Sequence, residues 1–380
     1  MRYFIRILYI IFPIRENRIL FSAHEGRSYK CNPKYVFEYL YTHFNVNFEY
    51  VWCINDSSVI PSEYNIKCVK FLSIKHLYYL ITSQIIISNI QIEPFLPPHK
   101  KRLVINTWHG GGAYKKGGLS ATYYSKPHRF YFKEIRNMRA KSTNYFISSC
   151  SAFSKIFSKE FNVTEHKMLP IGLPRNDIFF KNTIEKELIR NRVRRSLGLD
   201  QSKFILLYAP TYRGHERSVR KVNLGIDVLS VCKAVEKRFG KEVIFLFRCH
   251  MNMKKNYSSL DLSVDVSDYP DMQELLLLAD MIISDYSSFI WDYTFTYKPG
   301  FLFTPDLIDY ENEVKFHFPI QEWPYPYALN NEELCWQIIN YNESEAKSKI
   351  KEHHNLLGSY ESGEALPKIS SLLLEKIGKN

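Results

Sequence analysis

The sequence predicts an α/β protein with two Rossmann-like domains that face a central cleft. Short runs rich in β-branched and aromatic residues alternate with segments of helical periodicity, which is typical of parallel α/β units. This alternation occurs as two series of similar length that meet near residues 172–184. A chain of 380 residues also has the length of two ordinary domains. We therefore expect an N-terminal domain at 1–178 and a C-terminal domain at 179–380.

The first series consists of short apolar runs bounded by polar or turn residues, separated by segments with apolar residues at helical spacing. Strands are expected at Arg18–Ala23, Phe48–Ile54, Ile66–Phe71, Gln84–Ser88, Leu103–Thr107 and Tyr145–Ser148. Helices are expected at Pro33–His43, Ile74–Thr82 and Ala152–Phe161.

The second series follows a charged segment that should form a helix and end at a C-cap glycine, Glu185–Gly198. Strands are expected at Phe204–Tyr208, Val243–Phe247, Ser263–Val266, Met281–Ser284 and Phe301–Phe303. Helices are expected at Leu224–Phe239, Met272–Ala279, Ser287–Tyr297 and Asn331–Tyr341. A last helix within Gly363–Lys379 is expected to pack back across the domains.

The N-terminal segment Met1–Arg15 is basic and rich in Ile, Tyr and Phe. Its uninterrupted apolar run is far shorter than the roughly 20 residues that cross a bilayer, and no small-residue cleavage site follows it. Two interpretations stay open: a helix that lies in a membrane interface, or a helix packed on the core.

The net charge and the cysteine spacing indicate which partners and which metal or disulfide sites to expect. The net charge is +12, and residues 100–141 contain eleven Lys or Arg and one acid. The positive electrostatic potential that these charges create favours anionic partners. The seven cysteines are scattered without metal-ligand or disulfide-framework spacing, so reduced thiols and no metal are expected. No nucleic-acid-binding motif accompanies the charge, so we expect no nucleic-acid partner.

A glycine-rich loop follows the predicted strand that ends at residue 107. Its sequence places His109 before Gly110 and Gly111, with Lys115 and Lys116 a few residues on. Glycine N–H groups can cradle a phosphate, and a histidine at a strand end can act as general base. The lysines would bind a polyanionic acceptor. The alternative is a flexible loop beside a core histidine.

Two further loops carry candidate phosphate ligands. Thr211 and Arg213 follow one predicted strand of the second series, and Arg248 and His250 follow another. Arginine can bind phosphate through a bidentate fork, and Arg248 and His250 would lie on the same side of an extended chain. Each pair taken alone is also compatible with an ordinary loop.

The last candidate loop joins a predicted buried strand to a helix. Ser287 and Ser288 lie where the N-cap and first turn are expected, so their hydroxyl and N–H groups could bind phosphate. Asp292, about one turn later, could accept a hydrogen bond from a ribose or polyol hydroxyl. Simple helix capping is the alternative.

These residues, in this order, resemble the CDP-glycerol glycerophosphotransferase family, which includes teichoic acid primases and polymerases. The similarity covers most of the chain and is most specific around the Asp-Tyr-Ser-Ser sequence. The stretches that carry it are Asn32–Leu40, Thr107–Gly110, Tyr208–Arg213, Arg248–His250, Asp268–Asp271, Leu275–Asp280, Ser284–Ser288 and Lys298-Pro299.

The resemblance implies a GT-B-like architecture and transfer of glycerol phosphate, or a related polyol phosphate, from a CDP-polyol with release of CMP. It implies His109 and His250 as catalytic residues, a CDP-donor domain at the C-terminus and an acceptor-side domain at the N-terminus. The acceptor would be a lipid-linked or growing teichoic acid or capsule polymer. No cofactor is expected, and the enzyme would lie in the cytoplasm on the inner face of a bacterial membrane.

The chain departs from the family pattern at three places. Gly111 and Gly112 replace Thr or Ser followed by Pro, Met251 replaces a proline, and Glu313–Phe316 replaces an Arg-Gly pair. These positions leave the identity of the polyol open. Two other functions also stay open: a glycosyltransferase of the same fold that uses a nucleotide sugar, and a non-enzymatic binder of anionic lipid or nucleic acid.

Overall fold

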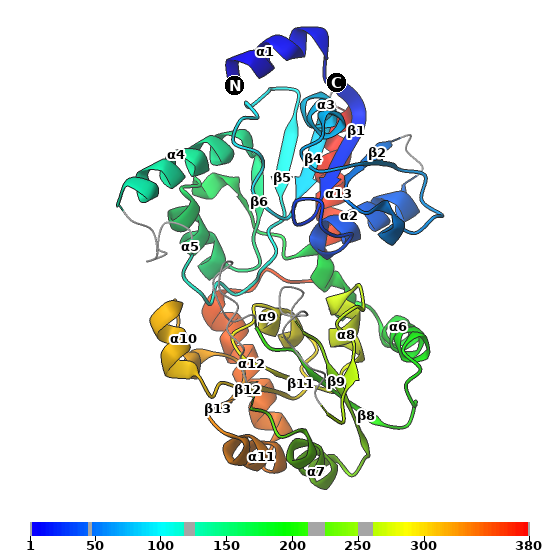
Figure 1. The fold of residues 1–380 in the computed structure, drawn as a ribbon, viewed down its shortest axis with the longest axis vertical. Coiled ribbons are helices and arrows are strands. Elements are labelled where there is room, and N and C mark those ends of the chain that lie inside the picture. The colour runs from blue at the N-terminus through cyan, green and yellow to red at the C-terminus, as the bar shows by residue number, and fades with distance from the viewer. Residues whose placement is uncertain (1, 45–47, 118–125, 212–224, 250–260, 379–380) are drawn as a thin grey trace. The chain divides into compact units, whose positions relative to one another are not determined.

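The structure, a computed structural model, describes residues 2–44, 48–117, 126–211, 225–249 and 261–378 (Figure 1). The chain forms two compact units. The first contains 1–113, 117–177 and 358–380, and the second contains 114–116 and 178–357. This division differs from the expected boundary in two places, because a tripeptide of the glycine-rich loop joins the second unit and the C-terminal segment joins the first.

The first unit is built on a parallel sheet with the order β3-β2-β1-β4-β5-β6-β7. Its strands are β1 (Arg15–Ser22), β2 (Glu49–Cys53), β3 (Lys67–Val69), β4 (Ser83–Ser88), β5 (Leu103–Asn106), β6 (Tyr145–Ile147) and β7 (Met168–Leu169). Its helices are α1 (Arg2–Ile11), α2 (Cys31–His43), α3 (Ile74–Thr82), α4 (Lys126–Ser142), α5 (Ser151–Phe161) and α13 (Ala365–Gly378).

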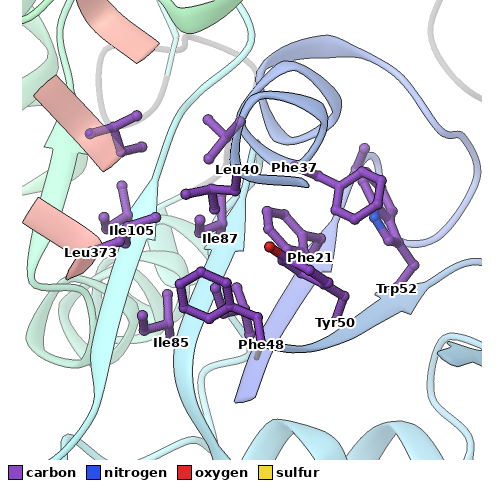
Figure 2. Close-up of a cluster of buried hydrophobic side chains, with 14 of the residues drawn as sticks. Phe21, Phe37, Leu40, Phe48, Tyr50, Trp52, Ile85, Ile87, Ile105 and Leu373 are labelled. Atoms are coloured by element: carbon purple, nitrogen blue, oxygen red, sulfur yellow. The ribbon is translucent and has the colours of Figure 1, made fainter. Parts of the chain in front are cut away.

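Both faces of this sheet are buried, which explains why its strands are continuous apolar runs. On one face Phe21 and Ile87 pack with Phe37 of α2 and Leu373 of α13 (Figure 2). On the other face the alternate residues, such as Ile86, pack with α1 and α3. The two-residue period of the strands therefore divides the core into two layers.

Helix α13 completes the core of the first unit. It packs on α2 and buries Ile369 and Leu373 completely. Its first N–H groups, at Ala365 and Leu366, donate to the carboxylate of Asp177 at 3.2 and 2.7 Å. Apolar burial and this cap place the C-terminal helix in the first unit, although the chain leaves that unit at residue 177.

Helix α1 has one packed face and one exposed face. Ile5 is buried, and Tyr9 accepts a hydrogen bond from the buried Arg102 at 2.7 Å. Ile10 and Ile11 on the other side are 83% and 63% exposed. The packed face agrees with a helix packed on the core, and the exposed apolar face is of the kind that a membrane-interface helix needs. Among the residues that the structure describes, no helix has the length and apolar character needed to cross a bilayer.

The second unit contains a parallel sheet with the order β10-β9-β8-β11-β12-β13. Its strands are β8 (Phe204–Tyr208), β9 (Val243–Phe247), β10 (Val264–Asp265), β11 (Met281–Ser284), β12 (Gly300–Phe303) and β13 (Tyr327–Ala328). Its helices are α6 (Thr183–Ser196), α7 (Val228–Phe239), α8 (Met272–Leu278), α9 (Phe289–Thr294), α10 (Leu307–Glu313), α11 (Asn331–Ile339) and α12 (Glu343–Leu357).

Every expected strand is present within a few residues, and the α/β class with two parallel sheets is confirmed. The sequence interpretation missed α4, α10 and α12, which have few apolar residues to reveal a helical period. It also missed β7 and β13, which have only two residues each. The helix expected at Ser287–Tyr297 is shorter, because α9 covers Phe289–Thr294.

We predict that Leu373→Ala destabilises the first unit by about 2–5 kcal/mol, because it opens a cavity in a fully buried core. Ile74→Ala is the control, since Ile74 is 89% exposed and its loss should change stability by less than about 0.5 kcal/mol. Urea unfolding of both variants measures the difference. Equal unfolding midpoints for the two variants would show that α13 does not stabilise this core.

Candidate functional site

Each sheet has one point where the strand order reverses, and candidate residues follow the strands at this point or the strands next to it. The reversal falls between β1 and β4 in the first unit and between β8 and β11 in the second. Loops leave such a point in opposite directions and open a crevice at the carboxyl ends of the strands, where ligands of α/β sheets bind. The structure therefore places the glycine-rich loop and the Asp-Tyr-Ser-Ser sequence beside the expected crevice of their own unit.

His109 follows β5 and is held at one ring nitrogen. Its Nδ1 lies 2.9 Å from the main-chain oxygen of Asn89, which follows β4. A carbonyl oxygen only accepts hydrogen bonds, so Nδ1 carries the proton and Nε2 of the neutral ring has the lone pair. The ring stacks on Trp108 with 4.5 Å between centroids. This tautomer makes Nε2 a suitable proton acceptor.

The surroundings keep the imidazole of His109 neutral. Desolvation by the surrounding protein lowers the pKa of His109, and the Arg175 guanidinium lowers it further, whereas the bond to Asn89 raises it. The residue as a whole nevertheless keeps an exposed surface.

The main chain around His109 is fixed by two buried side chains that sequence reasoning did not single out as functional. Asn32 Nδ2 donates to the carbonyls of Thr107 and Trp108, both at 3.0 Å. Arg175 Nη1 donates to the carbonyl of His109 at 2.8 Å. Asn32 belongs to a stretch that carries the family resemblance, but no local signal marks Arg175.

A second histidine, also missed, lies beside the first. His24 follows β1, and its ring centroid is 5.9 Å from that of His109. Asn89 bonds to both residues, because its Oδ1 accepts from the His24 N–H at 2.9 Å. Burial is the main reason why the pKa of His24 is lowered to about 3, and the neighbouring His109 ring and the cations Lys30, Arg27 and Arg175 lower it further. The site in the first unit is therefore electropositive without a charged histidine.

The glycine-rich loop continues into the second unit. Gly110 and Gly111 stay in the first unit, whereas Tyr114–Lys116 belongs to the second. There Lys115 forms an antiparallel bridge with Phe316, and its Nζ donates to Tyr310 at 3.2 Å.

Tyr310 in turn links Lys115 to the Asp-Tyr-Ser-Ser sequence. The ring of Tyr310 stacks on that of Tyr286 at 3.8 Å between centroids. Tyr286 is the tyrosine of that sequence. Lys115, which we expected to contact the acceptor, is thus held beside a candidate donor-binding element of the second unit.

The ends of β8 and β11 are joined by the buried carboxylate of Asp285. It accepts from the Thr211 N–H at 2.9 Å and from the Thr211 hydroxyl at 2.5 Å. Both donors of Thr211 are therefore used, and this geometry favours a role in holding the loop over donation to phosphate. Ser287 and Ser288 have hydroxyls without a hydrogen-bond partner in the described part of the chain.

Arg248 and Asp292, which we also expected to contact the donor, have different hydrogen-bond partners and burial. Arg248 Nη1 donates to the carbonyls of Val266 and Tyr269 at 3.2 and 2.8 Å, while its remaining N–H groups have no partner among the described residues. Asp292 is 1% exposed and accepts from Gln273 at 3.0 Å. This burial favours a structural role for Asp292 over the expected contact with a ribose or polyol.

Arg213 and His250 lie outside the described residues. Within the described ranges, no cluster of three or more His, Cys, Asp or Glu side chains has a geometry that could hold a metal ion.

Comparison with known proteins gives relatives along almost the whole chain. It is 24% identical over 392 aligned residues to the teichoic acid poly(glycerol phosphate) polymerase of Bacillus spizizenii, covering 97% of this chain and 96% of that protein. It is 27% identical to the teichoic acid ribitol-phosphate primase of the same species, covering 78% and 76% of the two chains. It covers only about half of some longer relatives.

The solved structure of the wall teichoic acid polymerase TagF is also similar, with a TM-score of 0.85 and 25% identity, covering 100% of this chain and 94% of that one. The family described as CDP-glycerol:poly(glycerophosphate) glycerophosphotransferase matches residues 4–375. The resemblance seen in the sequence is therefore confirmed: this chain belongs to the CDP-glycerol:poly(glycerophosphate) glycerophosphotransferase family.

Proposed function

We propose that this protein transfers glycerol phosphate, or a related polyol phosphate, from a CDP-polyol to a hydroxyl of a lipid-linked or growing teichoic acid or capsule polymer, releasing CMP. The observation that carries the proposal is the family match over residues 4–375. The tautomer of His109 leaves a lone pair on Nε2, and this nitrogen can serve as the base that such a transfer needs.

The proposed reaction is a direct displacement at phosphorus. His109 Nε2 takes the proton of an acceptor hydroxyl, and the hydroxyl oxygen attacks the β-phosphorus of the CDP-polyol. A new phosphodiester bond forms while the bond from that phosphorus to the bridging oxygen breaks, and CMP leaves with that oxygen. The proton then passes from His109 to solvent. Positioning and electrostatics supply most of the acceleration, as in other phosphoryl transfers.

We assign donor binding to the second unit and acceptor binding to the first, in a GT-B-like architecture. Ser287, Ser288 and the N–H groups of Arg248 that have no partner among the described residues suit the donor diphosphate. Lys115 joins them, because it is stacked through Tyr310 onto the same sequence element. Lys116 and the electropositive surroundings of His24 suit a polyanionic acceptor.

We also propose that α1 attaches the protein to the inner face of the cell membrane. The exposed side chains of Ile10 and Ile11 can enter the interface, and Arg15 at the end of the segment is exposed to anionic headgroups. A lipid-linked acceptor would be presented at the same surface.

The donor class is tested by supplying CDP-glycerol, CDP-ribitol and UDP-sugars with a lipid-linked acceptor. We expect CMP from one or both CDP-polyols and no UDP, because the family acts on CDP-linked polyols. UDP release alone would instead establish the nucleotide-sugar glycosyltransferase.

We predict that His109→Ala lowers kcat for CMP release by about 10²–10⁴-fold, the usual contribution of a general base. Binding of the CDP-polyol should change far less, since the proposed donor ligands lie in the second unit. His250→Ala should weaken donor binding and turnover together. The exposed His166 is the control, and His166→Ala should behave as wild type. Normal turnover in His109→Ala would remove the proposed base.

The pH dependence should report a base whose pKa is lower than usual. The neutral form of His109 is active, and its lowered pKa keeps that form populated below the ordinary histidine value of about 6.5. We therefore expect kcat/KM for CMP release to stay constant from pH 7 down to about 6.5 and to fall only at lower pH. An acidic limb centred above pH 7 would contradict this assignment.

Membrane attachment through α1 predicts that Ile10→Asp reduces binding to anionic vesicles by at least about tenfold, because an exposed apolar contact is replaced by a charge. Ile184→Asp is the matched control, since Ile184 is 74% exposed but lies on α6 of the second unit. Vesicle sedimentation measures both variants. Equal binding of the two would leave α1 as a packing helix only.

A further inference from the structure

Three consecutive carbonyls, from Thr107 to His109, are held by two buried side chains. Asn32 is completely buried and Arg175 is 4% exposed. Asn32 holds the first two carbonyls and Arg175 the third. The main-chain N–H of Arg175 also donates to Asn32 Oδ1 at 3.1 Å, so the Asn32 side chain also holds the backbone that carries Arg175.

The turn that this network holds is strained. Trp108 has a φ of +51°, in the left-handed region that a bulky side chain rarely adopts. Such a conformation costs on the order of 1–3 kcal/mol and persists only where its surroundings fix it. The next residue is His109, so relaxation of this turn would move the imidazole away from the Asn89 carbonyl.

We propose that Arg175, supported by Asn32, is a positioning residue of the reaction: it fixes the main chain of His109 and, through it, the position of the imidazole ring. The chemical consequence rests on the proposed function, in which His109 is the base. Arg175 itself contacts neither substrate nor reacting atoms in this account.

The charge of Arg175 also affects the pKa of His109. The positive charge of Arg175 opposes formation of a second cation on His109, so it lowers the pKa of that histidine. The other groups around the ring are His24, the Asn89 carbonyl and, next to Arg175, the Cys31 thiol at 3.1 Å from Nη1. Lys30 and Arg27 add positive charge near His24. Removal of the Arg175 charge should therefore raise the pKa of His109.

The test compares variants that separate geometry from charge. Arg175→Gln removes both, Arg175→Lys keeps the charge but not the guanidinium group, and Asn32→Ala removes three main-chain contacts without changing the charge. We expect each to lower kcat by about 10–100-fold with little change in the KM of the donor. Only Arg175→Gln should also move the acidic limb of the pH profile, upward by about 0.5–1 pH unit.

Arg102 provides a matched control within the same unit. It is 3% exposed, lies at the amino end of β5, and donates to the carbonyls of Ser83 and Ile81. Arg102→Gln should lower the melting temperature as Arg175→Gln does, while leaving the pH profile unchanged. The proposal would be overturned if Arg175→Gln and Arg102→Gln lost stability and activity equally and the acidic limb of the pH profile shifted in neither.

A measurement without turnover separates this inference from the proposed function. The pKa of His109 is measured by NMR titration of the histidine rings, with His109→Gln used to assign the signal. An upward shift in Arg175→Gln and none in Arg175→Lys would support the inference even if no CDP-polyol were turned over. An unchanged pKa of His109 in Arg175→Gln would contradict it even in an active transferase.

Discussion

The reversal of strand order in each parallel sheet is the constraint on which the candidate sites depend. All strands of a sheet end at one edge, and the loops diverge only where the order reverses, so polar groups can gather there around a ligand. In the first unit this brings together His24, Asn89 and, from the next strand, His109. In the second it joins Thr211 to Asp285 beside Ser287 and Ser288. Each unit thus has a polar cluster at the carboxyl edge of its sheet.

A base at such an edge needs a fixed tautomer and a low tendency to become charged. The main-chain oxygen of Asn89 fixes the tautomer of His109. Desolvation, together with the charge of Arg175, lowers its pKa. Cationic surroundings that disfavour protonation of His109 also favour anionic substrates. In the proposed reaction the same positive charge would favour binding of an anionic substrate and a neutral His109.

The sequence allowed the strands and the glycine-rich loop to be predicted, because apolar runs and glycine clusters are local signals. It did not reveal α4 or α12, whose helical period is hidden among charged residues. Arg175 could not be predicted as functional, since its contact to His109 spans 66 positions of the chain. The burial of Asp292 and the use of both Thr211 donors also depend on tertiary packing.

In the proposed reaction a polyol and its phosphate are transferred together from a CDP-linked donor. Mass spectrometry of a defined acceptor after incubation with CDP-glycerol tests this most directly. Each turnover should add one glycerol phosphate to the acceptor and release one CMP. Release of CMP without a change in acceptor mass, or the gain of a sugar without phosphorus, would contradict it.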